Sequence, residues 1–223
     1  SAGVLATGKH FPGHGDTDQD SHETLPTISF DEKRIDSIEL YPYRELINNG
    51  LASVMVAHLN IPSLEAQEGI PSSMSENIVT NILKERLGFK GLIFTDALNM
   101  KGASNYSSSA DVDLAAFKAG NDMLLISGNV TKGVARLVEA VEKGEISEER
   151  LAHSVKKVLQ SKYKVGLNKY KPIGTYNLVE DLNGLEDDIL YEELIENAIT
   201  VVKNKPDNLP LRSLETRSMA YVK

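Results

Sequence analysis

The sequence predicts an α/β fold with a parallel sheet, and specifically one half of an eight-stranded (β/α)8 barrel. Four short apolar runs are spaced along the chain, at residues 4–7, 53–57, 92–94 and 123–126. Their near-continuous hydrophobicity is typical of parallel strands buried on both faces. Amphipathic stretches lie between the runs, which gives a β-α alternation and four βα units. A doubly wound sheet competes with the barrel, but the runs end in polar residues that a barrel would collect at one face.

The stretches between the runs predict helices at residues 31–49, 75–87, 112–119 and 132–143. We expect the first helix to be interrupted at Pro42, because proline disrupts a helix interior. Ser73 or Ser75 is a candidate N-cap of the second helix, and Gly88 follows its end. Because a full barrel needs about 250 residues, four units indicate half a barrel.

The pattern changes after this region, and we predict three parts. Residues 1–167 form the half barrel with the candidate catalytic groups, and residues 168–217 form a linker and a helix at 185–200. Residues 218–223 begin a strand of a second domain. We expect the chain to be a fragment of a longer enzyme.

Composition excludes several classes of protein. The 223 residues carry a formal net charge of −8 without a basic run, which argues against nucleic acid or an anionic membrane as a partner. No run of 18 apolar residues exists, so we expect no membrane insertion. The absence of cysteine excludes a disulfide scaffold and a thiolate nucleophile. The compartment stays open, because residues 1–9 lack the pattern of a secretory signal.

The densest polar segment directly follows the first apolar run, at residues 9–22, and contains three His and three Asp residues. The glycine and lysine spacing of residues 3–9 matches a phosphate loop, but its middle is an apolar run and His10 follows the lysine. The aspartates resemble a calcium loop, which fails at its sixth and twelfth positions. The remaining metal candidates are His10, His14, Asp20 and His22. They lack a regular ligand spacing, so we predict no metal and no cofactor.

A second polar segment ends the third apolar run at Asp96. Alone, this residue could simply cap the next helix. At the same barrel face as Asp20 and His22, it indicates a nucleophile opposite a proton donor, the pair that glycoside hydrolysis requires. His58 ends the second run and is either a sugar-binding candidate or a strand-end histidine bonded to backbone. Asp122 is expected to fix the turn into the fourth run.

These motifs resemble glycoside hydrolase family 3, in particular its bacterial β-N-acetylglucosaminidase branch. The string Lys-His-Phe-Pro-Gly-His-Gly occupies residues 9–15 and is followed by Asp-Thr-Asp-Gln-Asp-Ser-His at residues 16–22, and Phe-Thr-Asp-Ala-Leu-Asn-Met occupies residues 94–100. The segments at 198–204 and 209–211 resemble the lead-in to the second domain of two-domain members, some of which are exported. The resemblance implies the C-terminal half of the barrel and a substrate containing N-acetylglucosamine, from peptidoglycan fragments or chitooligosaccharides.

The resemblance also implies roles for individual residues. Asp96 would be the nucleophile of a retaining mechanism, and His22 the general acid/base, polarised by Asp20. Lys9 and His10 would bind sugar hydroxyls, with His58 as a further candidate. The glycine-rich loop that carries His22 is expected to move between the two chemical steps.

Three alternatives and one assembly state stay open at this point. The chain could bind sugar or serve as a scaffold without catalysis, could be a metal-dependent hydrolase, or could transfer the sugar to phosphate in place of water. A half barrel exposes strand edges and core-facing apolar surface. We therefore expect self-association through the exposed half-barrel face.

Overall fold

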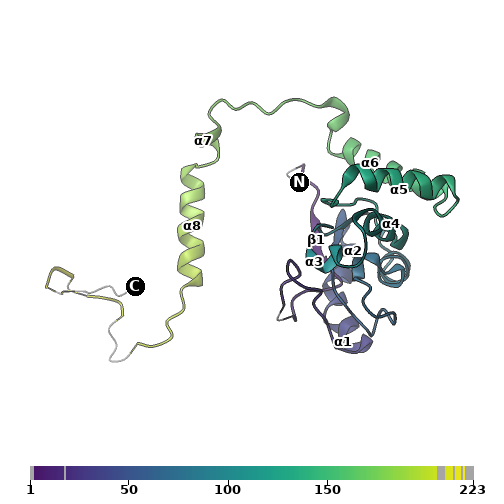
Figure 1. The fold of residues 1–223 in the computed structure, drawn as a ribbon. Helices are drawn as coiled ribbons and strands as arrows, with labels where there is room; N and C mark the ends of the chain where they lie inside the picture. Colours follow the sequence, from purple (N-terminus) through teal and green to yellow (C-terminus); the bar gives the residue numbers. More distant parts are fainter. Residues whose placement is uncertain (1–2, 18, 205–208, 213, 217, 219–223) are drawn as a thin grey trace. The chain divides into compact units, whose positions relative to one another are not determined.

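The structure is a computed structural model, and it describes residues 3–17, 19–204, 209–212, 214–216 and 218. The chain divides into two compact units, Ser1–Tyr170 and Lys171–Lys223 (Figure 1). The first unit contains the sheet. The described residues of the second unit contain two α-helices, which are described separately below, and the 3-10 helix η4 (Leu214–Thr216).

The first unit is built on a parallel sheet in the order β1-β2-β3. The strands are β1 (Thr7–Phe11), β2 (Ser53–Val56) and β3 (Leu92–Thr95). Ser53 faces Thr7 on one side and Leu92 on the other, so the central strand is paired along both edges. The α/β class and the parallel sheet are therefore confirmed, and the carboxyl ends of the strands lie at one edge.

The first strand begins later than predicted. We expected residues 4–7, but β1 starts at Thr7 and includes Lys9 and His10. β1 is an outer strand of the described sheet, and Val4 is 81% exposed, so the apolar run before it has no core to enter. Phe11, which is fully buried, anchors the strand instead.

The fourth predicted strand, residues 123–126, is reduced to a single bridge between Phe94 and Met123. The Met123 N–H donates to the carbonyl of Ile93 (3.0 Å), and the Thr95 N–H donates to the carbonyl of Met123 (3.0 Å). The backbone then leaves the extended region at Ile126, where φ is +46°. The prediction of four strands was wrong in this respect, because the Leu125 N–H donates to the Thr95 side chain (3.0 Å) and not to the backbone of β3.

The helices of the first unit alternate with the strands along the chain, as expected. They are α1 (Glu32–Ser37), α2 (Leu40–Asn48), η1 (Ser72–Met74), the π-helical η2 (Asn77–Arg86), α3 (Lys101–Ser104), α4 (Ser109–Ala119), α5 (Val130–Glu142), α6 (Glu148–Lys164) and η3 (Leu167–Lys169). The break between α1 and α2 falls at Ile38 and Glu39, and not at Pro42 as predicted. Pro42 lies in the first turn of α2, where a missing N–H costs nothing.

The main core fills the space between the sheet and α1, α2 and η2. It includes Phe11, Ile35, Leu40, Val54, Ile78, Leu83 and Ile93, all at most 1% exposed. Burial of such side chains contributes about 1.5–3 kcal/mol each. The core therefore fixes the strands whose ends carry the candidate site.

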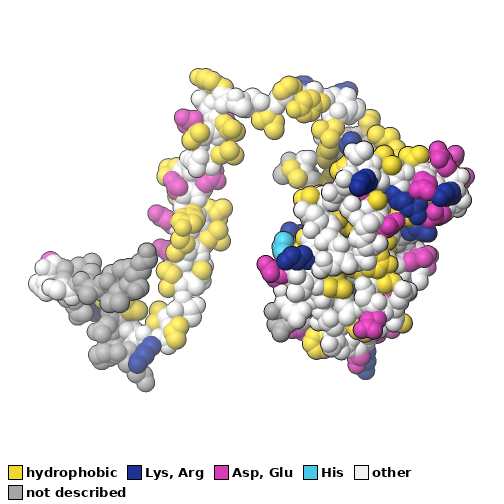
Figure 2. All heavy atoms as spheres, in the orientation of Figure 1, with side chains coloured by type: hydrophobic (Ala, Val, Ile, Leu, Met, Phe, Trp, Pro, Cys, Tyr) yellow, Lys and Arg dark blue, Asp and Glu magenta, His cyan; other side chains and the backbone are white. Residues whose placement is uncertain are grey.

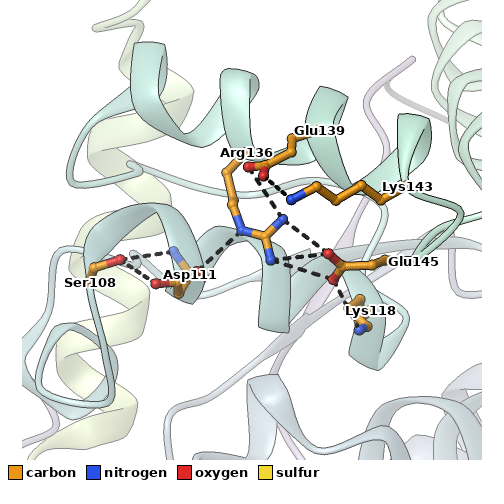
Figure 3. Close-up of polar contacts among 7 residues, drawn as sticks. All are labelled: Ser108, Asp111, Lys118, Arg136, Glu139, Lys143 and Glu145. Carbon is orange, nitrogen blue, oxygen red and sulfur yellow. Dashed lines mark hydrogen bonds and ion pairs between the residues drawn. The ribbon is translucent and has the colours of Figure 1, made fainter.

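A network of charged groups joins α4 to α5 (Figure 3). The Arg136 guanidinium on α5 lies 3.3 Å from Asp111 on α4 and 3.4 Å from Glu145. The Ser108 hydroxyl donates to Asp111 (2.6 Å), and this bond lowers the pKa of the Asp111 carboxyl. These groups are partly exposed and screened by solvent, so the network contributes little to stability.

A buried carboxylate, Asp122, connects the end of α4 to α6 and β3. Its side chain is fully buried and accepts hydrogen bonds from the Ile93 N–H (3.1 Å) and the Ser154 hydroxyl (2.5 Å). Lys157 on α6 supplies the countercharge. Asp122 thus holds the turn before residue 123, as the sequence predicted.

The second unit contains α7 (Leu178–Asp181) and α8 (Leu185–Ala198), close to the predicted helix 185–200. Hydrophobic and acidic side chains alternate along α8 (Figure 2). Leu190 and Leu194, on its predicted apolar side, are 53% and 60% exposed. The predicted strand 218–223 lies outside the described residues except for residue 218. Among the described helices, none is long and apolar enough to cross a membrane.

Candidate active site

Two of the predicted site residues meet at the carboxyl ends of β1 and β3. His10 Nε2 lies 3.6 Å from Asp96 Oδ2, and the two side chains are 30% and 15% exposed. The distance is too long for a direct hydrogen bond. The pair is therefore open toward a third group that could bridge it.

The two carboxylate oxygens of Asp96 have different surroundings. Oδ1 accepts a hydrogen bond from the Ala97 N–H (2.8 Å), and the Asp96 N–H donates to the carbonyl of Val56 (2.8 Å). Oδ2 is the oxygen that faces His10. The backbone thus fixes the carboxylate and leaves one oxygen directed at the strand ends, which suits a nucleophile.

The imidazole of His10 is uncharged at neutral pH. Burial lowers the pKa of its imidazole, and the opposing attraction of Asp96 is a smaller effect. A neutral imidazole has one donor and one acceptor nitrogen. His10 can therefore both donate to and accept from a hydroxyl group that approaches Asp96.

Asp20 and His22 form a second pair on the loop after β1. Asp20 Oδ1 lies 2.7 Å from His22 Nδ1 and accepts from the His22 N–H (2.9 Å). These two bonds, the backbone one first, lower the pKa of the Asp20 carboxyl. Because an ionised carboxylate only accepts, Nδ1 carries the proton that faces it. Nε2 is then the nitrogen available for proton transfer.

The Asp20–His22 pair is exposed to solvent, with side chains 66% and 74% accessible. Its loop contacts the segment after Asp96 through backbone bonds, since the Lys101 N–H donates to the carbonyl of His22 (3.4 Å). The chain therefore places the His22 loop beside the segment that begins at Asp96.

His58 does not lie where a sugar could reach it. The residue is fully buried, with Nδ1 2.7 Å from the Ser73 hydroxyl and Nε2 3.1 Å from the carbonyl of Ala97. Burial lowers the pKa of this imidazole, so it is neutral. The expectation of sugar contact is corrected in favour of the alternative, a strand-end histidine bonded to backbone.

Lys9 precedes His10 on β1 and is exposed. Both residues line a hollow of about 420 Å³ beside β1. The other residues around the hollow include His14, Asp16, Arg34, Glu39 and Tyr43. Asp96, Asp20 and His22 are not among its lining residues.

The structure brings His10 close to Asp96 and Asp20 close to His22, and among the described residues no hydrogen bond or ion pair joins the side chains of the Asp20–His22 pair to Asp96. Within the described residues, no group of three or more His, Asp or Glu side chains is arranged to hold a metal ion. Sequence reasoning did not single out Ser21, which is 5% exposed between two exposed neighbours. The only available signal was its place between Asp20 and His22 in the motif.

Comparison with known proteins identifies the family. The model of the glycosyl hydrolase family 3 N-terminal domain matches residues 1–161. The chain belongs to glycosyl hydrolase family 3. The resemblance read from the motifs at residues 9–22 and 94–100 is thereby confirmed.

Relatives with this domain carry consistent names. A β-hexosaminidase A of Pseudoalteromonas piscicida is 32% identical, over 95% of this chain and 38% of the relative. A β-hexosaminidase of Methylobacillus flagellatus is 38% identical, over 58% of this chain and 36% of the relative. The chain thus spans less than two fifths of the length of these curated relatives.

Solved structures agree in fold. A family 3 β-N-acetylglucosaminidase from Paenibacillus superposes with a TM-score of 0.73 at 38% identity, covering 78% of this chain and 33% of the other. A β-glucoside phosphorylase, BglX, superposes with a TM-score of 0.85 at 28% identity, covering 93% of this chain and 39% of the other. The three-stranded sheet of this family 3 chain thus matches part of a larger structure in each case.

Proposed function

We propose that this family 3 chain carries the catalytic residues of a retaining β-N-acetylglucosaminidase that removes terminal N-acetylglucosamine. Asp96 is the nucleophile, and the Asp20–His22 pair is the general acid/base. The names of the relatives support the substrate class. The observation that carries the proposal is the Asp96 carboxylate, fixed through Oδ1 and directed at His10 through Oδ2.

In the first step, Asp96 Oδ2 attacks the anomeric carbon while the bond between that carbon and the leaving oxygen breaks. His22 Nε2–H gives its proton to that oxygen, and a glycosyl ester on Asp96 results. In the second step, His22 removes a proton from water, and the water oxygen displaces Asp96 from the anomeric carbon. Two displacements retain the β configuration.

The acid/base assignment agrees with the chemistry of the imidazole. An imidazole can give a proton from one ring nitrogen when it is protonated and take one back when it is neutral, so one histidine can serve as acid and then as base. The Asp20 carboxylate orients the ring and stabilises the imidazolium that forms in the second step. Lys9 and His10 bind sugar hydroxyls, since a cation and a neutral imidazole together supply donors and an acceptor.

We further propose that the sheet and its helices are the C-terminal half of a (β/α)8 barrel, and that two copies associate through the open face. β1 has β2 as its one partner among the described strands, so the other edge of β1 is open. An open strand edge favours association. Sedimentation at micromolar concentration should show a dimer or larger species, and a strict monomer would contradict this.

The test of function is hydrolysis of 4-nitrophenyl β-N-acetylglucosaminide by the full chain. Asp96→Asn should lower kcat by at least about 10³-fold, because it removes the nucleophile. Asp111→Asn, at a half-exposed aspartate on α4 that contacts none of the proposed site residues, is the matched control and should leave turnover unchanged. Equal turnover in wild type and Asp96→Asn contradicts the proposal.

The same assay separates the alternatives. Absence of turnover by the folded wild-type chain favours a sugar-binding or scaffold role, and inhibition by a chelator favours a metal-dependent hydrolase. The superposition with BglX makes phosphorolysis the second candidate function. Formation of N-acetylglucosamine 1-phosphate in the presence of inorganic phosphate would establish that reaction.

A further inference from the structure

Ser21 is a buried residue between two exposed ones. It is 5% exposed, whereas the side chains of Asp20 and His22 on either side of it are 66% and 74% exposed. A buried hydroxyl needs hydrogen-bond partners. The contacts of Ser21 therefore show what holds this part of the loop.

The side chain and the backbone of Ser21 contact two different elements. Its hydroxyl lies 3.2 Å from His14 Nε2, and its carbonyl accepts from the Gly102 N–H at the start of α3 (3.3 Å). A Cβ atom on Gly102 would lie 2.8 Å from the carbonyl oxygen of Thr24 and 3.1 Å from that of Ser21. The loop thus packs so closely against Gly102 that a side chain at this position would clash with it.

His14 is itself held at both ring nitrogens. The Thr17 hydroxyl lies 2.8 Å from Nδ1, and the ring packs edge-on against His10, with centroids 6.2 Å apart. His10 in turn faces Asp96. A continuous series of contacts therefore runs from Asp96 through His10 and His14 to Ser21.

We propose that Ser21 and His14 are positioning residues that anchor the Asp20–His22 pair relative to Asp96. The anchor fixes the loop at one buried point and leaves the two flanking side chains free to turn toward the substrate. This inference rests on the proposed function, in which His22 gives a proton to the leaving group. Neither Ser21 nor His14 needs to touch the substrate for this role.

Amide hydrogen exchange of the full chain tests the anchor without requiring turnover. Ser21→Ala and His14→Ala should each speed exchange of the Lys101, Gly102 and Thr24 amides by about three- to tenfold, the effect of losing about one hydrogen bond. His14→Gln, whose amide can still reach Ser21, should restore much of the protection. His153→Ala, an exposed histidine on α6, should change nothing.

The amide of Asp96 serves as an internal reference, because it donates to Val56 in the sheet. Exchange that rises equally there would indicate general destabilisation and overturn the proposed anchor. Unchanged exchange at residues 101, 102 and 24 would also overturn it.

Kinetics with two aryl β-N-acetylglucosaminides tests the positioning role. A 2,4-dinitrophenyl leaving group needs little protonation, whereas a phenyl leaving group needs a proton from His22. Ser21→Ala should therefore lower kcat/KM about tenfold for the phenyl substrate and less than about twofold for the dinitrophenyl substrate. Equal losses on both substrates would overturn the positioning role. Unimpaired turnover by Asp96→Asn would instead refute the proposed function, and hydrogen exchange would then still test whether Ser21 and His14 anchor the loop.

Discussion

His58 supports the strand end that carries Asp96, and its replacement by alanine should show this as a loss of stability. The substitution leaves the fully buried Ser73 hydroxyl without its partner, at a cost of about 1–3 kcal/mol. Loss of the bond to the Ala97 carbonyl adds about 1 kcal/mol, and the vacated ring volume adds about 1–2 kcal/mol. We expect the free energy of unfolding to fall by about 4 kcal/mol.

The measurement is urea unfolding followed by circular dichroism. With a slope of about 2 kcal/mol per molar urea, His58→Ala should lower the unfolding midpoint by about 2 M. His153→Ala removes an exposed histidine and should change the free energy by less than about 0.5 kcal/mol. A loss below about 1 kcal/mol for His58→Ala, together with a raised KM, would refute the supporting role and restore sugar contact.

Three further predictions follow from the same contacts. Asp122→Ala should lower the free energy of unfolding by about 3–5 kcal/mol, because it leaves buried donors and a cation unpaired. Glu139→Ala at the surface should leave the unfolding midpoint almost unchanged in the same urea experiment. Burial lowers the pKa of His10 and of His58 below 6.5, so the unfolded state binds more protons and stability should fall as pH drops below about 6.5, by less than about 1.4 kcal/mol per pH unit for each histidine. His10→Asn should make this slope between pH 7.5 and 5.5 shallower and leave the part that comes from His58. Gly13 has φ +152° and no room for a Cβ beside Glu39, whereas Gly15 has open space. Gly13→Ala should therefore lower the unfolding midpoint. Gly15→Ala should leave the midpoint unchanged but lower kcat if motion of the loop limits turnover, and an unchanged kcat would argue against that motion.

The parallel sheet could be predicted because its strands are short apolar runs buried in the core. Val54 and Ile93 are both fully buried, and their runs contain almost no polar residue. The first strand was predicted too early because Val4 is apolar but lies exposed at the edge of the sheet. The prediction of a fourth strand failed because the Leu125 N–H bonds to the Thr95 side chain in place of a backbone carbonyl, and apolar character does not indicate that partner.

The candidate site could be predicted as residue types but not as contacts. Asp96, Asp20 and His22 were identified by motif, and their local bonds, such as Asp20 to His22, join near neighbours in sequence. His58 was ambiguous because burial of a strand-end histidine depends on Ser73, 15 residues away. Long-range packing of this kind has no local signal.

Trapping of the glycosyl intermediate tests the central claim most directly. A 5-fluoro-N-acetylglucosaminyl fluoride has a good leaving group for the first step, and its ring fluorine slows the second, so the ester should accumulate on the full chain. Peptide mass spectrometry should place the label on Asp96, and Asp96→Asn should give no label. A label on another residue would contradict the account, as would rapid turnover by Asp96→Asn.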